Sequence, residues 1–99
     1  SEKILSQVEE FVNRLEIRLK KRISNARKIG LYVHVSCLVE RLIRQSPIED
    51  YANLDEFEQC QKEMINTIKE SFSVIEKLYN VKINTAEIGY IYDYINETA

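Results

Sequence analysis

The single histidine of the chain, His34, is the side chain best suited to chemistry near neutral pH. Its unperturbed pKa leaves a neutral ring nitrogen whose lone pair can accept a transferred group. His34 lies in the apolar run from Gly30 to Leu42, with Cys37 one helical turn on and Arg41 two turns on. A histidine that accepts a phosphoryl group needs an open nitrogen, space beside it and a nearby cation. Gly30 would leave that space, and Arg41 is the candidate cation.

Packing is the alternative role for His34, and it is the commoner one for a lone helical histidine. Three other chemistries find little support. One histidine and two cysteines, without C-x-x-C or H-x₃-H spacing, fall short of a four-ligand zinc site. Cys37 lacks the glycine-rich turn of an oxyanion site, and no glycine-rich phosphate loop occurs. We therefore expect no metal, no cofactor and no enzymatic activity.

The composition is that of one soluble globular domain. Of the 99 residues, 44% are hydrophobic and 30% are charged, which is enough to form a core without disulfides or metals. Two glycines and one proline favour long helices over a sheet rich in tight turns. No apolar stretch is long enough to span a membrane, so we expect no membrane contact.

The start of the chain and its cysteines bear on whether it is part of a larger protein and on its cellular compartment. Because there is no starting methionine, we expect residues 1–99 to be a single domain from a larger protein. Cys37 and Cys60 each lie in an apolar helical pattern, which predicts buried, reduced thiols. Reduced cysteines favour the cytoplasm.

Charge is unevenly distributed along the chain. Residues 1–45 carry ten Lys and Arg against five Asp and Glu, and the remainder carries four against eleven. This asymmetry favours packing of the two halves against each other, or antiparallel pairing of two copies. One basic cluster comprises Lys20, Lys21 and Arg22 with Arg27 and Lys28. We interpret it as a solvated helix end rather than a nucleic-acid surface.

Hydrophobic residues recur at helical spacing along most of the chain. Helices are expected from Ile4 to Leu19, from Arg27 to about Gln45, from Leu54 to Asn80 and from Asn84 to Ile95. As one helix, the third would be roughly 38 Å long, so we expect a bend near residues 71–73. The pattern predicts an all-α, compact bundle of four to five helices.

Local signals mark several helix ends and inner faces. Ser24 is a candidate N-cap, Ser46-Pro47 should end the second helix, and Asn84 with Glu87 resembles a capping box. The second helix is apolar around so much of its circumference that it should lie at the centre of the bundle. Its expected inner stripe is formed by Ile29, Tyr32, Val35, Val39 and Leu42.

Two motifs together resemble a known regulatory domain. The first is the run from Gly30 to Leu42, with Glu40-Arg41 following the histidine, and the second is the closing stretch Glu87-Ile-Gly-Tyr-Ile-Tyr-Asp-Tyr-Ile95. In order and spacing they resemble the PRD, the phosphotransferase-system regulation domain of bacterial transcription regulators. The resemblance implies a five-helix bundle that forms homodimers and is phosphorylated on histidine by HPr or by enzyme II components of the phosphotransferase system.

The resemblance also assigns roles to individual residues. His34 matches the first phosphoacceptor, Arg41 the arginine that follows it, and Glu87 and Tyr90 the signature of the last helix. Tyr94 stands where many members carry a second histidine, which implies that a second phosphorylation site is lost. Val33 stands where many members have an acidic residue.

The sequence around His34 resembles most the corresponding sequence of LevR-like activators, which act with sigma-54 polymerase. We therefore expect a regulatory domain, part of a larger regulator, that does not itself contact nucleic acid. Two alternatives remain open. A histidine phosphotransfer domain of a two-component relay would usually place Lys and Gly soon after the histidine, whereas Val35-Ser36-Cys37-Leu38 follow here. The other alternative is a structural oligomerisation bundle in which His34 is packed and inert.

Overall fold

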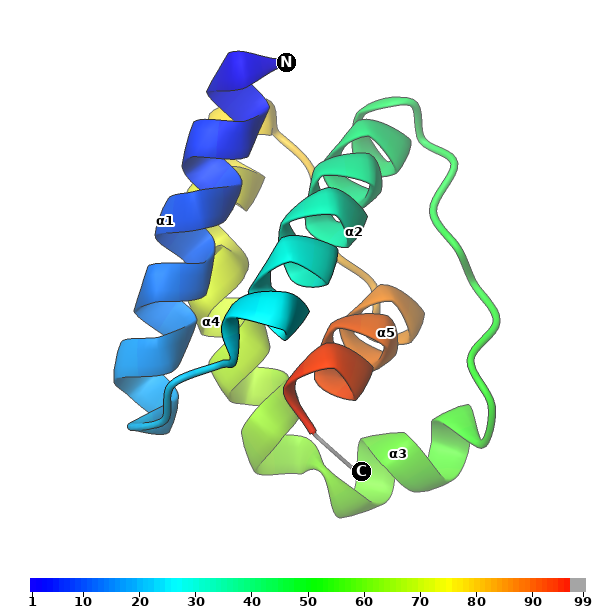
Figure 1. The fold of residues 1–99 in the computed structure, drawn as a ribbon. Helices are drawn as coiled ribbons and strands as arrows, with labels where there is room; N and C mark the ends of the chain where they lie inside the picture. Colours follow the sequence, from blue (N-terminus) through cyan, green and yellow to red (C-terminus); the bar gives the residue numbers. More distant parts are fainter. Residues whose placement is uncertain (97–99) are drawn as a thin grey trace.

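Two long helical hairpins make up most of the computed structural model, which describes residues 1–96 (Figure 1). The helices are α1 (Glu2–Leu19), α2 (Asn25–Ile43), α3 (Leu54–Cys60), α4 (Lys62–Tyr79) and α5 (Thr85–Ile95). No strand occurs in residues 1–96. The predicted all-α bundle is therefore confirmed, with five helices over this range.

The four long helices surround one core. Helix α1 packs against α2 and α4, and α5 packs against the other sides of α2 and α4. In Figure 1, α1 and α4 run in opposite directions, as do α2 and α5, while α3 lies across one end of the bundle. At the centre the rings of Phe11 and Phe72 meet edge to face, with their centroids 5.4 Å apart. This geometry is the favourable one for two aromatic rings.

The two hairpins repeat the same local structure at a spacing of 60 residues. Helices α1 and α4 have 18 residues each, and both end at a residue in the left-handed conformation. Each of these helices has a glutamate near its end, and the carboxylate of this glutamate accepts a hydrogen bond from the backbone N–H seven residues later. The equivalent pairs are Lys20 and Asn80, Glu16 and Glu76, Ile23 and Ile83, and the N-cap residues Ser24 and Asn84.

The predicted bend near residues 71–73 is wrong. Helix α4 continues through this stretch, where the Ser71 hydroxyl donates to the Thr67 carbonyl within the helix. The chain breaks instead at Gln61, which has φ −119° and separates α3 from α4. The new direction of α3 lets Phe57 pack between Tyr51 and Tyr92, at centroid distances of 5.1 and 5.3 Å. Packing of Phe57, rather than a local helix breaker, accounts for the position of the break.

The predicted inner face of α2 is only partly correct. Val35, Val39 and Leu42 are buried, but Ile29 is 65% exposed and the neighbouring Val33 is 63% exposed. The cysteines are free, as predicted, but both are exposed rather than buried. Helix α2 therefore has an apolar outer face that no other part of residues 1–96 covers. None of the helices in that range is both long and apolar enough to cross a lipid bilayer.

Candidate functional site

Helices α2 and α5 bring the predicted histidine and two predicted tyrosines together. The His34 ring lies 5.3 Å from the Tyr94 ring and 6.2 Å from the Tyr90 ring, centroid to centroid. The spacing of 60 residues that relates the two hairpins also relates His34 to Tyr94. The two rings therefore meet from equivalent positions on equivalent helices. Tyr94, which stands at the position of the second histidine in the family motif, is thus part of the site around His34.

The space beside Gly30 is occupied by Tyr94. A Cβ atom at Gly30 would lie 2.9 Å from Cε1 of Tyr94, closer than real side chains approach. The glycine thus leaves room for an aromatic ring of α5, rather than for an open pocket next to His34. Any group added to His34 must share this space with Tyr94.

The His34 side chain is half-buried, and its Nε2 atom is buried with no hydrogen-bond partner. Burial lowers the pKa of His34 below its ordinary value of 6.5, and the nearby positive charge of Arg41 lowers it further. The negative charge of Glu87 opposes this effect. His34 is consequently neutral at pH 7, which is the protonation state required of a nucleophile.

We expect the stability of the domain to fall on acidification because of His34. The pKa of His34 is near 6.5 in the unfolded chain and lower in the folded one. Between these two values the unfolded state binds more protons, so the free energy of unfolding rises with pH there and levels off above 6.5. Urea denaturation of the wild type and of His34→Gln between pH 5 and 8 measures this contribution. An equal pH dependence of the two proteins in this window would contradict it.

Arg41 forms a two-pronged ion pair with Glu87 across the α2–α5 interface. Its Nε donates to Oε2 at 3.0 Å and its Nη2 donates to Oε1 at 2.8 Å. The Glu87 side chain is completely buried, and its Oε2 also accepts the N–H of Ile48 at 2.9 Å. The hydrogen bonds that Arg41 donates to Glu87 raise the pKa of Arg41. Arg41 thus acts electrostatically on His34, as expected of a nearby cation, but its guanidinium is already bound to a carboxylate.

The predicted capping box at the start of α5 is wrong. Asn84 is the N-cap residue, but its side chain makes no capping hydrogen bond. Instead its Nδ2 donates to the Ile48 carbonyl at 2.8 Å, and Glu87 binds Arg41 and Ile48. Both side chains therefore bind residues from a distant part of the chain instead of capping the helix. Glu87 does so because it lies in the core, where its charge needs a counter-ion.

A segment that the sequence did not implicate completes the site. Tyr90 donates its hydroxyl to the Asp50 carbonyl at 2.9 Å, and Tyr51 donates to Asp93 Oδ1 at 2.7 Å. Tyr51 also lies over Gly89, where a Cβ atom would be only 2.8 Å from its ring. In the sequence, Gly89 is the one local feature that indicates where this segment lies, because a glycine allows the ring to approach the helix closely. The carboxylate of Glu40, another residue predicted from the family motif, takes part in none of these contacts.

Metal binding finds no support in residues 1–96. No group of three or more His, Cys, Asp or Glu side chains is placed there to hold a metal ion.

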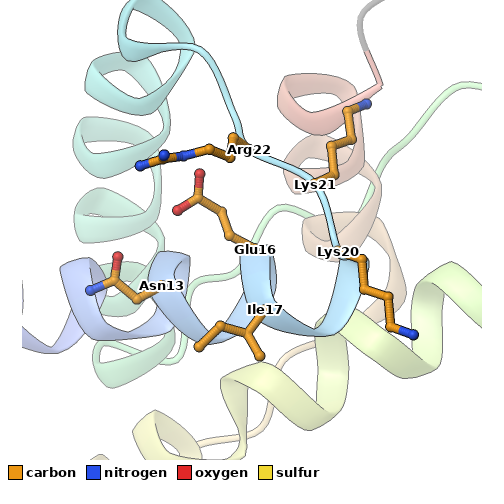
Figure 2. Close-up of a pocket in the computed structure, with 6 residues that line it drawn as sticks. All are labelled: Asn13, Glu16, Ile17, Lys20, Lys21 and Arg22. Carbon is orange, nitrogen blue, oxygen red and sulfur yellow. The ribbon is translucent and has the colours of Figure 1, made fainter.

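Part of the basic cluster lines a shallow depression of about 580 Å³ at the end of α1 (Figure 2). Its lining residues are Asn13, Glu16, Ile17, Lys20, Lys21 and Arg22. In Figure 2 the Glu16 carboxylate points toward the Asn13 and Arg22 side chains, while Lys20 and Lys21 extend away from it. Burial opposes ionisation of Glu16, but the Ile23 N–H and the Lys28 ammonium outweigh it and lower the pKa of Glu16.

Several cations of this cluster bind oxygens of the protein itself. Lys28 pairs with Glu16 at 3.2 Å, and the Lys21 ammonium donates to the Ile95 carbonyl at 3.4 Å. Arg27 donates to the carbonyls of Asp93 and Tyr94 at the end of α5. Cations at a helix C-terminus stabilise its exposed carbonyls. These contacts give the cluster a structural role in joining the α1–α2 link to α5.

Comparison with known proteins identifies the family of the chain. The PRD domain family model matches residues 9–98. The transcriptional regulatory protein DagR of Salmonella typhimurium (strain 14028s / SGSC 2262) is 29% identical over 97 residues, which cover 93% of this chain and 10% of DagR. The chain thus spans a small part of the length of this curated relative. No solved structure matches the chain. The five-helix bundle, the motifs on α2 and α5 and the matched family model lead to one conclusion: the chain belongs to the PRD domain family.

Proposed function

We propose that this domain is the phosphotransferase-system-controlled regulatory part of a cytoplasmic bacterial transcription regulator, and that His34 is its phosphoacceptor. Family membership and the similarity to a transcriptional regulatory protein support the general role. The observation that carries the assignment of His34 is its place in the structure: the one histidine of the chain lies at the α2–α5 interface, and its Nε2 makes no hydrogen bond. Burial also lowers its pKa, which favours the neutral ring. The sequence of the α2 motif favours the LevR-like, sigma-54-dependent class of regulators. The domain itself would be non-enzymatic and would not contact nucleic acid.

The chemistry is a transfer between two nitrogen atoms. The donor is a phosphohistidine of HPr or of an enzyme II component. Its N–P bond breaks as a new N–P bond forms at His34, and the donor ring recovers its lone pair. No water is consumed. Because Nε2 is buried, transfer to this atom requires movement of the tyrosine rings that pack on His34. With Tyr94 in place of a second histidine, each domain would carry one phosphate.

The outer face of α2 supports a homodimer interface beside His34. Ile29 and Val33 are 65% and 63% exposed, and Cys37 is exposed on the same helix. Apolar side chains grouped in this way mark surfaces that associate. A phosphoryl group at the edge of such a face adds a charge of about −1.5 to −2, which repels or attracts the partner strongly enough to change the interface.

Phosphoryl transfer to His34 is tested with phosphoenolpyruvate, enzyme I, HPr and candidate enzyme II components. The wild-type domain is expected to gain one acid-labile phosphate, and His34→Gln is expected to gain none. Arg18→Met, which removes an exposed arginine outside the site, is the matched control and should be labelled like the wild type. Equal labelling of the wild type and His34→Gln would disprove the assignment.

A structural oligomerisation bundle is a second candidate, and the burial of Nε2 favours it. In that case His34 only packs against Tyr90 and Tyr94. The same assay separates the two functions, because a packed and inert histidine is not labelled by any donor. Size-exclusion chromatography would then still report a dimer.

A further inference from the structure

The segment that joins α2 to α3, residues 44–53, contains no helix and is held along α5. In Figure 1 it runs as an extended loop beside α5, from the end of α2 to the start of α3. Four hydrogen bonds fasten it. They are Ile48 N–H to Glu87 Oε2 at 2.9 Å, Asn84 Nδ2 to the Ile48 carbonyl at 2.8 Å, Tyr90 hydroxyl to the Asp50 carbonyl at 2.9 Å, and Tyr51 hydroxyl to Asp93 Oδ1 at 2.7 Å.

Glu87 is the point at which this segment, α2 and α5 meet. Its completely buried carboxylate accepts two hydrogen bonds from Arg41 and one from the Ile48 N–H. An ionised carboxylate away from water is stable only when a counter-charge and hydrogen bonds replace its hydration. The contact between Glu87 and the 44–53 segment therefore depends on Arg41.

Arg41 and His34 lie on the same face of α2. They are seven residues apart, which is two helical turns or about 10 Å along the axis. Long side chains on a helix tend to lean toward its N-terminus, which is the direction in which His34 lies from Arg41. The positive charge of Arg41 lowers the pKa of His34, and the negative charge of Glu87 raises it. A charge placed on that ring acts in turn on both members of the ion pair.

We propose that a phosphoryl group on His34 weakens the Arg41–Glu87 ion pair and thereby releases residues 44–53 from α5. This inference rests on the proposed function, since it takes His34 as the phosphoacceptor. The phosphate attracts the Arg41 guanidinium, which can form two-pronged hydrogen bonds with phosphate as well as with carboxylate. The same phosphate repels Glu87. Both effects weaken one ion pair, and the Ile48 N–H then loses its acceptor.

The first test uses the unmodified domain. Amide hydrogen exchange of Ile48 is measured in the wild type and in Arg41→Met, with exchange at Phe11 in α1 as the internal reference. Arg41→Met is expected to raise Ile48 exchange at least about tenfold relative to Phe11, because local opening alone exposes that amide. Arg41→Lys keeps the charge but not the two-pronged geometry, and should raise it by a smaller factor.

The matched control is Arg18→Met, which removes an exposed arginine from its 3.6 Å pair with Glu70. Exchange at Ile48 should not change in this variant. If Arg41→Met does not fold, the folded Arg41→Lys decides the result. Exchange at Ile48 that is unchanged in the folded Arg41 variants would overturn the inference.

The second test adds the phosphate without a partner protein. Potassium phosphoramidate transfers its phosphoryl group to histidine: its P–N bond breaks, ammonia leaves and an N–P bond forms at the ring. Phosphorylated wild type should show Ile48 exchange faster by about tenfold, and His34→Gln treated in the same way should not change.

The outcomes separate this inference from the proposed function. Labelling by phosphoramidate or HPr with no change at Ile48 overturns the inference and leaves the phosphoacceptor role intact. Faster exchange after chemical labelling, in a domain that neither HPr nor enzyme II labels, supports the inference and overturns the proposed donor. If no reagent labels His34, both are overturned.

Discussion

Replacement of Arg41 with methionine is expected to lower the free energy of unfolding by about 3 kcal/mol. The variant leaves the Glu87 carboxylate completely buried and without its counter-ion. Removing one partner of a buried pair costs more than the pair contributes, because the remaining charge must be desolvated alone or protonated. Methionine retains much of the arginine side chain's apolar volume, so the loss reports on charge rather than on a cavity. Urea denaturation at pH 7 measures it.

Two further variants test whether this loss of stability comes from the unpaired charge of Glu87. Arg18→Met disrupts a pair whose side chains are 46% and 66% exposed, and it should cost less than about 0.5 kcal/mol. The double variant Arg41→Met/Glu87→Leu removes both charges and should recover a large part of the stability lost in the single variant. If Arg41→Met and Arg18→Met were equally stable, the Arg41–Glu87 pair could not be the electrostatic centre of the α2–α5 interface.

Replacement of Gly89 with alanine is expected to destabilise the domain by about 1–3 kcal/mol. In an open helix the same change would stabilise by up to about 1 kcal/mol, because alanine is the better helix former. Here the new Cβ atom would lie 2.8 Å from three carbons of the Tyr51 ring, including Cγ. The ring cannot easily yield, since it contacts Phe57 and Tyr90 and its hydroxyl binds Asp93.

A double-mutant cycle isolates this steric cause. In a Tyr51→Ala background the ring is absent, and Gly89→Ala should then stabilise the domain by several tenths of a kcal/mol. The sign of the effect thus reverses between the two backgrounds. Thermal unfolding of the four proteins in the cycle measures it. Destabilisation of equal size in both backgrounds would mean that Tyr51 is not the obstacle.

The helices could be predicted from the sequence because their ends and apolar spacing are local signals. Ser24 caps α2 as expected, with its hydroxyl accepting the Arg27 N–H, and Ile88, Ile91 and Ile95 form the buried side of α5. The break at Gln61 carries no such signal. It follows from the packing of Phe57 on α5, which becomes visible only when helices distant in sequence are placed together.

Three residues of the candidate site could be singled out from the sequence, but their contacts and the segment around Tyr51 could not. The motifs singled out His34, Arg41 and Glu87, and the structure brings all three to the α2–α5 interface. Their pairing was not predicted, because Glu87 three residues after Asn84 fits a capping box equally well in sequence. The choice between the two roles depends on burial of the carboxylate, a tertiary property. Likewise, helical periodicity identified Ile29 as apolar without indicating that this residue faces outward.

The repetition of one hairpin at a spacing of 60 residues has a consequence for molecules at high concentration. The two hairpins pack on each other through α1–α4 and α2–α5 contacts, and a dimer that exchanged its α4–α5 hairpins would keep these same contacts. Domain swapping of this kind needs a connecting segment that can straighten into a hinge. Residues 44–53 join the two hairpins, and the four hydrogen bonds that hold them along α5 oppose such straightening.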